Sequence, residues 1–156
     1  PQALENMTVL ENITIGALLK HSKVYEATEY AKEISAFCGL SELNEKMASG
    51  LNVMQKKRLE IARALAGDPK LLLLDETMAG LNGVERDEAI ELIRRINKKG
   101  ITILMIEHVM KVVMSVSSKV VVIVSGKKLM EGTPDEVTSN PEVINAYLGG
   151  GHNAGR

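Results

Sequence analysis

The sequence lacks the features that mark several classes of protein. It holds one cysteine and three scattered histidines, so its spacing indicates no metal-ligand cluster. No apolar run approaches the roughly 18 residues that a membrane-spanning helix needs. The formal net charge of −1 provides no basic footprint for nucleic acid. With 45% apolar residues in 156, the composition predicts one domain with a hydrophobic core.

The lone cysteine, Cys38, lies at the end of a predicted amphipathic helix. Tyr30, Ile34 and Phe37 complete the apolar stripe of that helix, and Gly39 closes it. Cys38 has two possible roles, a buried small hydrophobic residue or a reactive thiol. The apolar stripe favours the buried role.

Two short apolar runs in the middle of the chain predict buried strands of a parallel sheet. The first run, residues 71–74, is followed at once by Asp75 and Glu76. The second run is residues 101–106, and His108 stands two residues after its end. Short apolar runs with turn signals at their ends are typical of strands that are buried on both faces.

The segment between these runs predicts a helix. Residues 85–99 carry apolar side chains at helical spacing, namely Ala89, Leu92, Ile93 and Ile96. Gly100 stands where a helix C′ glycine belongs. Strand, helix and strand in this order predict an α/β fold with Asp75, Glu76 and His108 at the carboxyl edge of the sheet. Open α/β sheets bind their ligands at that edge.

The two acids suit phosphate chemistry. An aspartate at the end of a buried strand can hold Mg²⁺ through water while the metal bridges phosphates. A glutamate one residue later can orient or deprotonate an attacking water, which is worth roughly 10²–10⁴ in rate. The alternative is that Asp75 and Glu76 only end a strand and begin a turn.

The rest of the chain reads as helices and one hairpin. Helices are expected from the capping box of Thr8 and Glu11 to about Leu19, at 55–66, after the capping box of Thr133 and Glu136, and from Pro141 to about 148, with a short helical face at 110–114. A strand at 120–124 and a turn at 125–127 are expected to lead into an antiparallel strand near 129–130. Four basic residues of segment 55–66 are interpreted as a solvated helix face rather than an anion site: Lys56, Lys57, Arg58 and Arg63.

The motifs around the two acids resemble the ATPase subunits of ATP-binding cassette (ABC) transporters. Residues 55–65 resemble the helix after the signature motif, residues 71–75 the Walker B strand, residues 79–82 the D-loop and His108 the switch histidine. The similarity is greatest to branched-chain amino acid importer ATPases, through residues 7–12, 58–63, 79–82, 106–108 and 147–149.

This resemblance implies a partial P-loop NTPase fold, a mostly parallel sheet flanked by helices. It implies part of a helical subdomain at residues 1–50, an α/β core with C-terminal helices at 51–149, and a disordered tail at 150–156. The cofactors would be ATP and Mg²⁺. Asp75 would hold the metal through water, Glu76 would activate water, and His108 would contact the γ-phosphate. Three further residues would serve the nucleotide site or its dimer contact: Leu51, Gln55 and Asn82.

The resemblance also implies partners and a location. They are a second ABC ATPase subunit and membrane permease subunits, with no nucleic acid. The protein would be cytoplasmic and peripheral on the inner face of the cell membrane. The alternative is a non-catalytic fragment or degenerate paralogue that acts only through protein contacts.

Several positions depart from the family pattern. No Walker A motif, G-x-x-x-x-G-K-[ST], occurs in the sequence. We therefore expect a C-terminal part of a longer ATPase that is inactive alone. Val53 and Met54 replace the signature glycines, Thr77 replaces the usual proline, and Val109 replaces the usual aspartate.

The family's strand order makes a further prediction. The strand of the Walker A motif lies between segments 101–106 and 120–124 there. Without it, either these two segments pair directly or a second copy of the chain completes the sheet.

Overall fold

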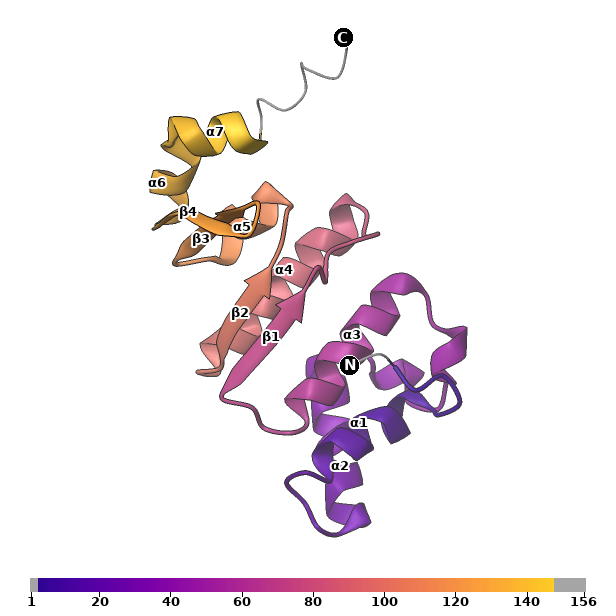
Figure 1. Cartoon of the computed structure of the whole chain (residues 1–156). Helices are drawn as coiled ribbons and strands as arrows, with labels where there is room; N and C mark the ends of the chain where they lie inside the picture. Colours follow the sequence, from indigo (N-terminus) through magenta and orange to yellow (C-terminus); the bar gives the residue numbers. More distant parts are fainter. Residues whose placement is uncertain (1–2, 148–156) are drawn as a thin grey trace. The chain divides into compact units, whose positions relative to one another are not determined.

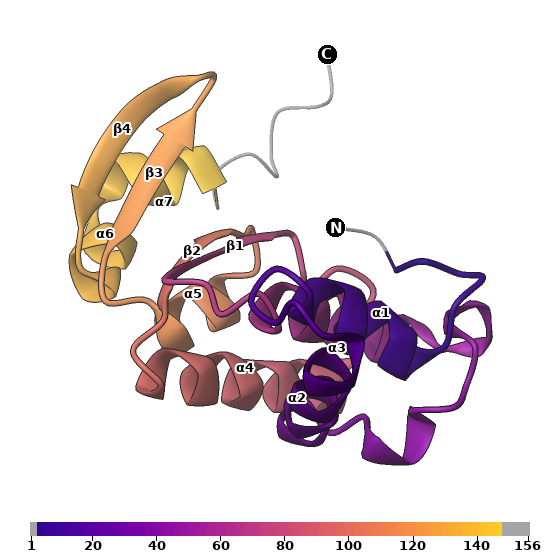
Figure 2. The ribbon, with the colours of Figure 1, turned by 90° about the horizontal axis from the view of Figure 1, so that it is seen from below.

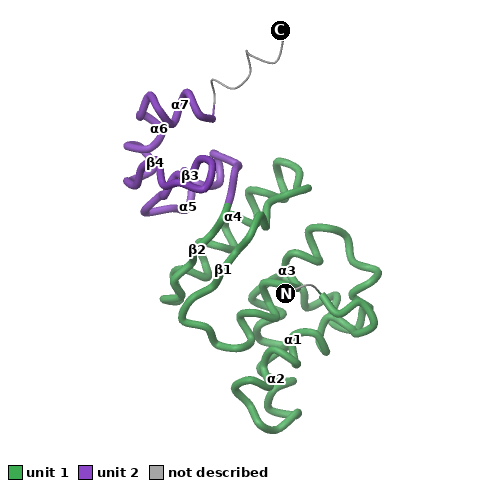
Figure 3. The backbone as a smooth tube through the Cα atoms, viewed as in Figure 1, with its two compact units in different colours: residues 1–106 green, residues 107–156 purple. Residues whose placement is uncertain are grey.

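The computed structural model describes residues 3–147, and the α/β class is confirmed. The chain divides into two compact units, residues 1–106 and residues 107–156 (Figure 3). The subdomain boundary expected after residue 50 lies inside the first unit and stays a prediction. The tail predicted at 150–156 lies outside the described residues.

The first unit begins with helices that pack on one another (Figure 1). The α-helices are α1 (Val9–Ala17), α2 (Val24–Phe37) and α3 (Val53–Leu65). Two short 3₁₀ turns, η1 (Ser41–Leu43) and η2 (Ala48–Gly50), lie between α2 and α3. The capping box of Thr8 and Glu11 is present at the start of α1. A Cβ atom at Gly16 would lie 2.2 Å from the backbone oxygen of Arg63, so glycine allows α1 and α3 to approach closely.

A strand–helix–strand segment follows these helices. It consists of β1 (Leu71–Asp75), α4 (Gly83–Lys98) and β2 (Thr102–Ile106). The strands are parallel and in continuous register from Leu71 opposite Thr102 to Asp75 opposite Ile106. The predicted order and the predicted parallel pairing are both confirmed. The predicted burial of both faces is wrong, because exposed residues alternate with buried ones in β1 and with half-buried ones in β2.

One face of this strand pair is covered by helix. The four apolar residues predicted on the inner face of α4 are all buried, and so are Leu72 and Leu74 of β1. In Figure 2, α4 runs below β1 and β2, and no helix of the first unit lies above them. Leu73 and Leu104, which belong to the uncovered face, are 66% and 61% exposed.

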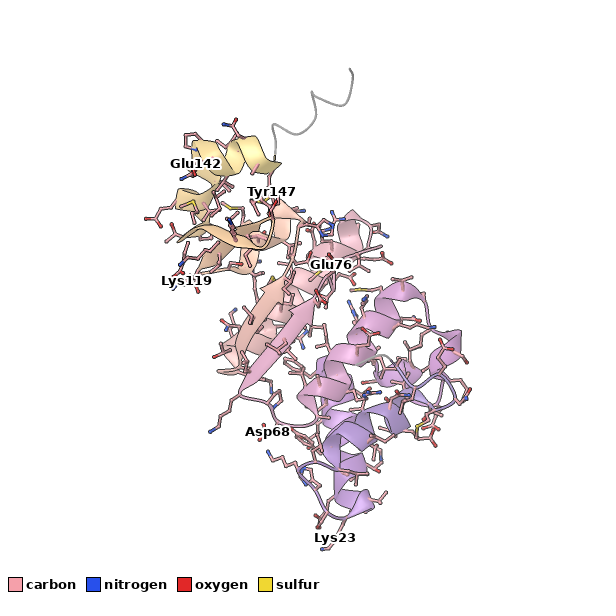
Figure 4. The ribbon with its side chains drawn as sticks, in the orientation of Figure 1. Lys23, Asp68, Glu76, Lys119, Glu142 and Tyr147 are labelled. Atoms are coloured by element: carbon pink, nitrogen blue, oxygen red, sulfur yellow. The ribbon has the colours of Figure 1, made fainter. Side chains whose placement is uncertain are left out.

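The second unit is a hairpin packed on short helices. Its elements are α5 (Met110–Val116), β3 (Val120–Val124), β4 (Lys127–Gly132), α6 (Pro134–Ser139) and α7 (Pro141–Tyr147). The predicted turn is confirmed, with positive φ at Ser125 and Gly126. The hydrophobic core of the second unit consists of Val122, Val137 and Val143. The hydroxyl of Tyr147, labelled in Figure 4, donates to the backbone oxygen of Ile123.

The direct pairing of segments 101–106 and 120–124 is wrong. Among the described residues, β1 and β2 form one two-stranded sheet and β3 and β4 form another. The hairpin closes through a two-residue turn, so β3 finds its partner at a small cost in loop entropy. A pairing with β2 would require a longer closure around α5.

Cys38 is confirmed as a buried residue. Its side chain is 2% exposed, and this burial raises the pKa of the thiol to about 12, against a smaller opposing effect of Arg95 and Arg58. Because only the thiolate is nucleophilic, folding should slow the reaction of Cys38 in two ways. Burial limits the access of a reagent to the sulfur, and the raised pKa lowers the fraction of thiolate.

We expect the Cys38 thiol to react with a disulfide reagent roughly 100-fold or more slowly in the native chain than in the urea-unfolded chain. The absorbance of the released thiolate at pH 8, recorded with and without denaturant, gives both rates. Equal rates would contradict the buried assignment.

The end of β1 carries a backbone conformation that is unfavourable for its residue. Glu76 has a φ of 45°, in the left-handed region where a Cβ atom is crowded. Its N–H still donates to the backbone oxygen of Ile106 at 3.0 Å, so the turn begins without loss of this hydrogen bond. A left-handed residue other than glycine costs roughly 1–2 kcal/mol.

We expect the Glu76→Gly variant to be more stable than Glu76→Ala by about 1 kcal/mol, because both remove the carboxylate but only glycine relieves the crowding. Urea unfolding followed by circular dichroism measures the difference. An alanine variant at least as stable as the glycine variant would show that the strand end is not strained.

Candidate functional site

The candidate site begins with two acids at the carboxyl end of β1. Asp75 is the last residue of the strand and stands opposite Ile106, and both Asp75 and Glu76 are exposed. The hydrogen bond from the Glu76 N–H to the backbone oxygen of Ile106 fixes the backbone where the strand ends. Figure 4 shows Glu76 at the end of β1, where the chain turns toward α4. The predicted strand-end position of both acids is therefore present.

The loop after Glu76 is anchored by apolar side chains. Met78 and Leu81 are 1% and 5% exposed, so the loop is tied to the interior at two points. Thr77 replaces the proline that the family pattern has here. Its buried hydroxyl has no hydrogen-bond partner among the described residues, and an unsatisfied group of this kind costs roughly 1–3 kcal/mol.

Asn82 ends this loop and caps α4. Its side-chain oxygen accepts from the N–H groups of Val84 and Glu85, each at 3.0 Å. The Glu85 carboxylate accepts in turn from the Asn82 N–H at 2.9 Å, which completes a capping box. The carbonyl end of this side chain is thus engaged in the helix start, and only its amide NH₂ group is left for other contacts.

The start of α3 also carries a capping box. Asn52 accepts from the Gln55 N–H at 2.8 Å, and the Gln55 side chain accepts from the Asn52 N–H at 3.1 Å. Leu51 is 7% exposed, so its side chain faces the interior. Val53 is 54% exposed, and its Cγ1 lies 3.7 Å from the position that a Cβ atom would occupy at Gly80.

The structure thus brings two sequence motifs together within the first unit. The start of α3 lies beside the loop at 76–82 through Val53 and Gly80. Asp75, Glu76 and Asn82 belong to that loop or its ends. His108, which is exposed, lies between β2 and α5 in the second unit.

The capping roles of Asn82 and Gln55 were not part of the sequence prediction, although the signal for them was available. Both helix starts carry asparagine followed three residues later by glutamate or glutamine, which is the spacing of a capping box. The left-handed backbone at Glu76 had no such signal, because no glycine marks that position.

The acids at the end of β1 fit Mg²⁺ better than a metal that needs three or more protein ligands. Among residues 3–147, no group of three or more histidine, cysteine or acidic residues is placed to hold an ion. Mg²⁺ commonly keeps several waters and needs only one or two carboxylates besides phosphate oxygens. The exposed Asp75 carboxylate fits that role through water. The triphosphate of ATP fits only in part, because the sequence contains no G-x-x-x-x-G-K-[ST] cradle.

A groove lies between α1 and α2, away from the acids. It has a volume of about 280 Å³ and is partly apolar, with Met7, Leu10, Ile15 and Val24 in its lining. Val24 is 65% exposed and Ile15 is 39% exposed.

No helix described here combines the length and the apolar character needed to cross a bilayer.

Two family models match the sequence. Residues 1–79 match a family described as "ABC transporter", and residues 127–153 match one described as "Branched-chain amino acid ATP-binding cassette transporter". The first range includes Asp75 and Glu76, and the second includes β4, α6 and α7.

Curated relatives carry the same description. The chain is 45% identical to the high-affinity branched-chain amino acid transport ATP-binding protein BraF of Pseudomonas aeruginosa, over 80% of this chain and 49% of BraF. It is 40% identical to LivG of Escherichia coli K12, a protein with the same description, over 92% of this chain and 62% of LivG. The chain therefore spans about half to three fifths of the length of these relatives.

Solved structures show the same fold. An ATP-binding cassette of an ABC transporter, MJ1267 in its ADP conformation, matches with a TM-score of 0.81 at 31% identity, over 94% of this chain and 64% of that one. A putative metal-chelate type ABC transporter in an inward-facing conformation matches with a TM-score of 0.84 at 19% identity, which supports the fold alone. The chain belongs to the ABC transporter family of ATP-binding cassette proteins.

Proposed function

We propose that this chain supplies the hydrolytic edge of an ATPase subunit that powers the uptake of branched-chain amino acids. The observation that carries the proposal is the acid pair at the end of β1, held beside β2 by the hydrogen bond from Glu76 to Ile106. The similarity to BraF and LivG supports the importer type and the solute class.

Each polar group has a proposed role at this edge. Asp75 would hold Mg²⁺ through water, and the ion would supply positive charge near the phosphates of ATP. Glu76 accepts a proton from the attacking water or orients it. His108 contacts the γ-phosphate.

The start of α3 and the loop end are proposed to meet a second ABC ATPase subunit. Leu51 and Gln55 flank the helix start that faces the partner's nucleotide, and the free amide of Asn82 donates across the dimer. Leu51 acts here through its backbone, because its side chain is buried. Asn82 uses only its NH₂ group, because its oxygen caps α4.

The groove between α1 and α2 is proposed to receive the membrane permease. Its apolar lining, with Ile15 and Val24 partly exposed, suits an apolar segment of a permease loop. The protein would then be cytoplasmic and peripheral on the inner face of the cell membrane.

The start of α3 supports a second candidate function, a non-catalytic subunit that acts through protein contacts. The Asn52 side chain accepts from the Gln55 N–H and the Gln55 side chain accepts from the Asn52 N–H. Val53 and Met54 stand where glycines would let a phosphate approach. In this case the acids of β1 would serve only the turn.

A fusion experiment separates the two candidates. A segment of an ABC ATPase that contains the G-x-x-x-x-G-K-[ST] motif, joined ahead of Ala3, adds a phosphate-binding loop to the chain. We expect the fusion to hydrolyse ATP, and Glu76→Gln to lower the rate roughly 100-fold or more while nucleotide binding by calorimetry persists, because the amide keeps the volume but removes the base. Phosphate release measures the rate.

Two controls complete the experiment. Glu33→Gln changes an exposed acid of α2 outside the site and should leave the rate unchanged. The 156-residue chain alone should neither hydrolyse Mg-ATP nor bind it with sub-micromolar affinity. Hydrolysis that is insensitive to Glu76→Gln, or a fusion without activity, would favour the non-catalytic candidate.

A further inference from the structure

The peptide group between Leu81 and Asn82 is held at both of its polar ends by side chains near the start of α4. The backbone oxygen of Leu81 accepts a hydrogen bond from Nη2 of Arg86 at 3.0 Å. The N–H of Asn82 donates to Oε2 of Glu85 at 2.9 Å. Because a peptide group is planar, its C=O and its N–H cannot turn independently of each other. Two neighbouring side chains, one basic and one acidic, therefore fix the orientation of one peptide group.

Both of these hydrogen bonds involve a charged side chain. Hydrogen bonds with an ionised donor or acceptor are roughly twice as strong as those between neutral groups. A rotation of the peptide group between Leu81 and Asn82 would break both of them at once. We call Glu85 and Arg86 the peptide clamp, because together they oppose a change of direction at the end of the loop 76–82.

The peptide clamp acts on the backbone of Asn82, whose side chain is already engaged at one end. The side-chain oxygen caps α4, and the amide NH₂ group is left for other contacts. The direction of that NH₂ group follows from the direction of the Cα–Cβ bond, which the clamped peptide group sets. On the other side of the same peptide group, the Leu81 side chain is buried and holds the chain to the interior.

Arg86 lies at a position where an arginine contributes little to the stability of its helix. A cation close to the N-terminus of a helix meets the positive end of the helix dipole, which is unfavourable. The Nε group of Arg86 is also buried, and no acceptor for it exists among the described residues. A buried donor without a partner destabilises the fold. Such departures from local rules are expected where a residue serves function rather than stability.

We propose that Arg86 is a positioning residue, which together with Glu85 clamps the peptide group before Asn82 and so sets the direction of the Asn82 amide. Its purpose rests on the proposed contact of Asn82 with a second ATPase subunit. The peptide clamp itself can be measured without ATP and without that subunit. A failure of the peptide clamp and a failure of the proposed function therefore give different results.

Hydrogen exchange of the 156-residue chain, followed for each amide by NMR, tests the peptide clamp. We expect Arg86→Met to speed exchange of the Asn82 amide at least tenfold, because methionine keeps a long side chain but donates no hydrogen bond. The amides of β1 that are bonded to β2 should keep their rates. The urea midpoint should not fall, because the substitution also removes a cation from the start of the helix. Arg94→Met changes another arginine of α4 and is the matched control, which should leave the Asn82 amide unaltered.

A double substitution tests whether the two side chains hold the same peptide group. Glu85→Met should speed exchange of the Asn82 amide when made alone. Added to Arg86→Met, it should speed exchange by a smaller factor, because the peptide group is already released at one end. Factors that simply multiply in the double variant would overturn the proposal. So would unchanged exchange in Arg86→Met, or a lower urea midpoint with equally faster exchange in β1, since Arg86 would then support the fold as a whole.

Discussion

The parallel pairing of β1 with β2 determines where every polar group of the site in the first unit stands. It places Asp75 opposite Ile106 and lets Glu76 donate one more hydrogen bond before the chain turns. Because side chains alternate along a strand, a slip of one residue would turn Asp75 towards α4 and expose Leu72 and Leu74. Burial of those two leucines against the helices therefore also specifies the direction of the aspartate.

The same pairing has consequences on both sides of the strands. On one side, α4 covers the leucines and brings Asn82 to the end of the loop, where it caps the helix. On the other side, the chain leaves a row of aliphatic side chains exposed. The position of the acids at the strand end and the exposure of this apolar row thus depend on one small sheet. Strain at Glu76 lies at the point where the strand must become a loop.

The sequence predicted those features that depend on local patterns. Apolar runs located β1 and β2, helical spacing located α4, and capping boxes located α1 and α6 within one or two residues. Pairing between distant segments was predicted less well. The hairpin of β3 and β4 was expected, but the separation of its sheet from the sheet of β1 and β2 was not.

The candidate site shows the same limit. Asp75 and Glu76 were located correctly at the end of a strand, since their position follows from the apolar run before them. The engagement of the Asn82 oxygen in its own helix depends on side-chain geometry, and the sequence prediction assigned it only a role across a dimer. The left-handed backbone of Glu76 arises from the turn that β2 and the buried loop impose, for which the residue type gave no sign.

Hydrogen exchange at the Glu76 amide tests most directly whether strand pairing positions the acids. Its N–H is bonded to Ile106 although its residue lies outside β1. If the pairing holds the site, this amide should exchange as slowly as the amides of β1 that are bonded to β2. Exchange at the rate of an unstructured peptide, with β1 still protected, would show that the acid lies on a free loop and would contradict the account.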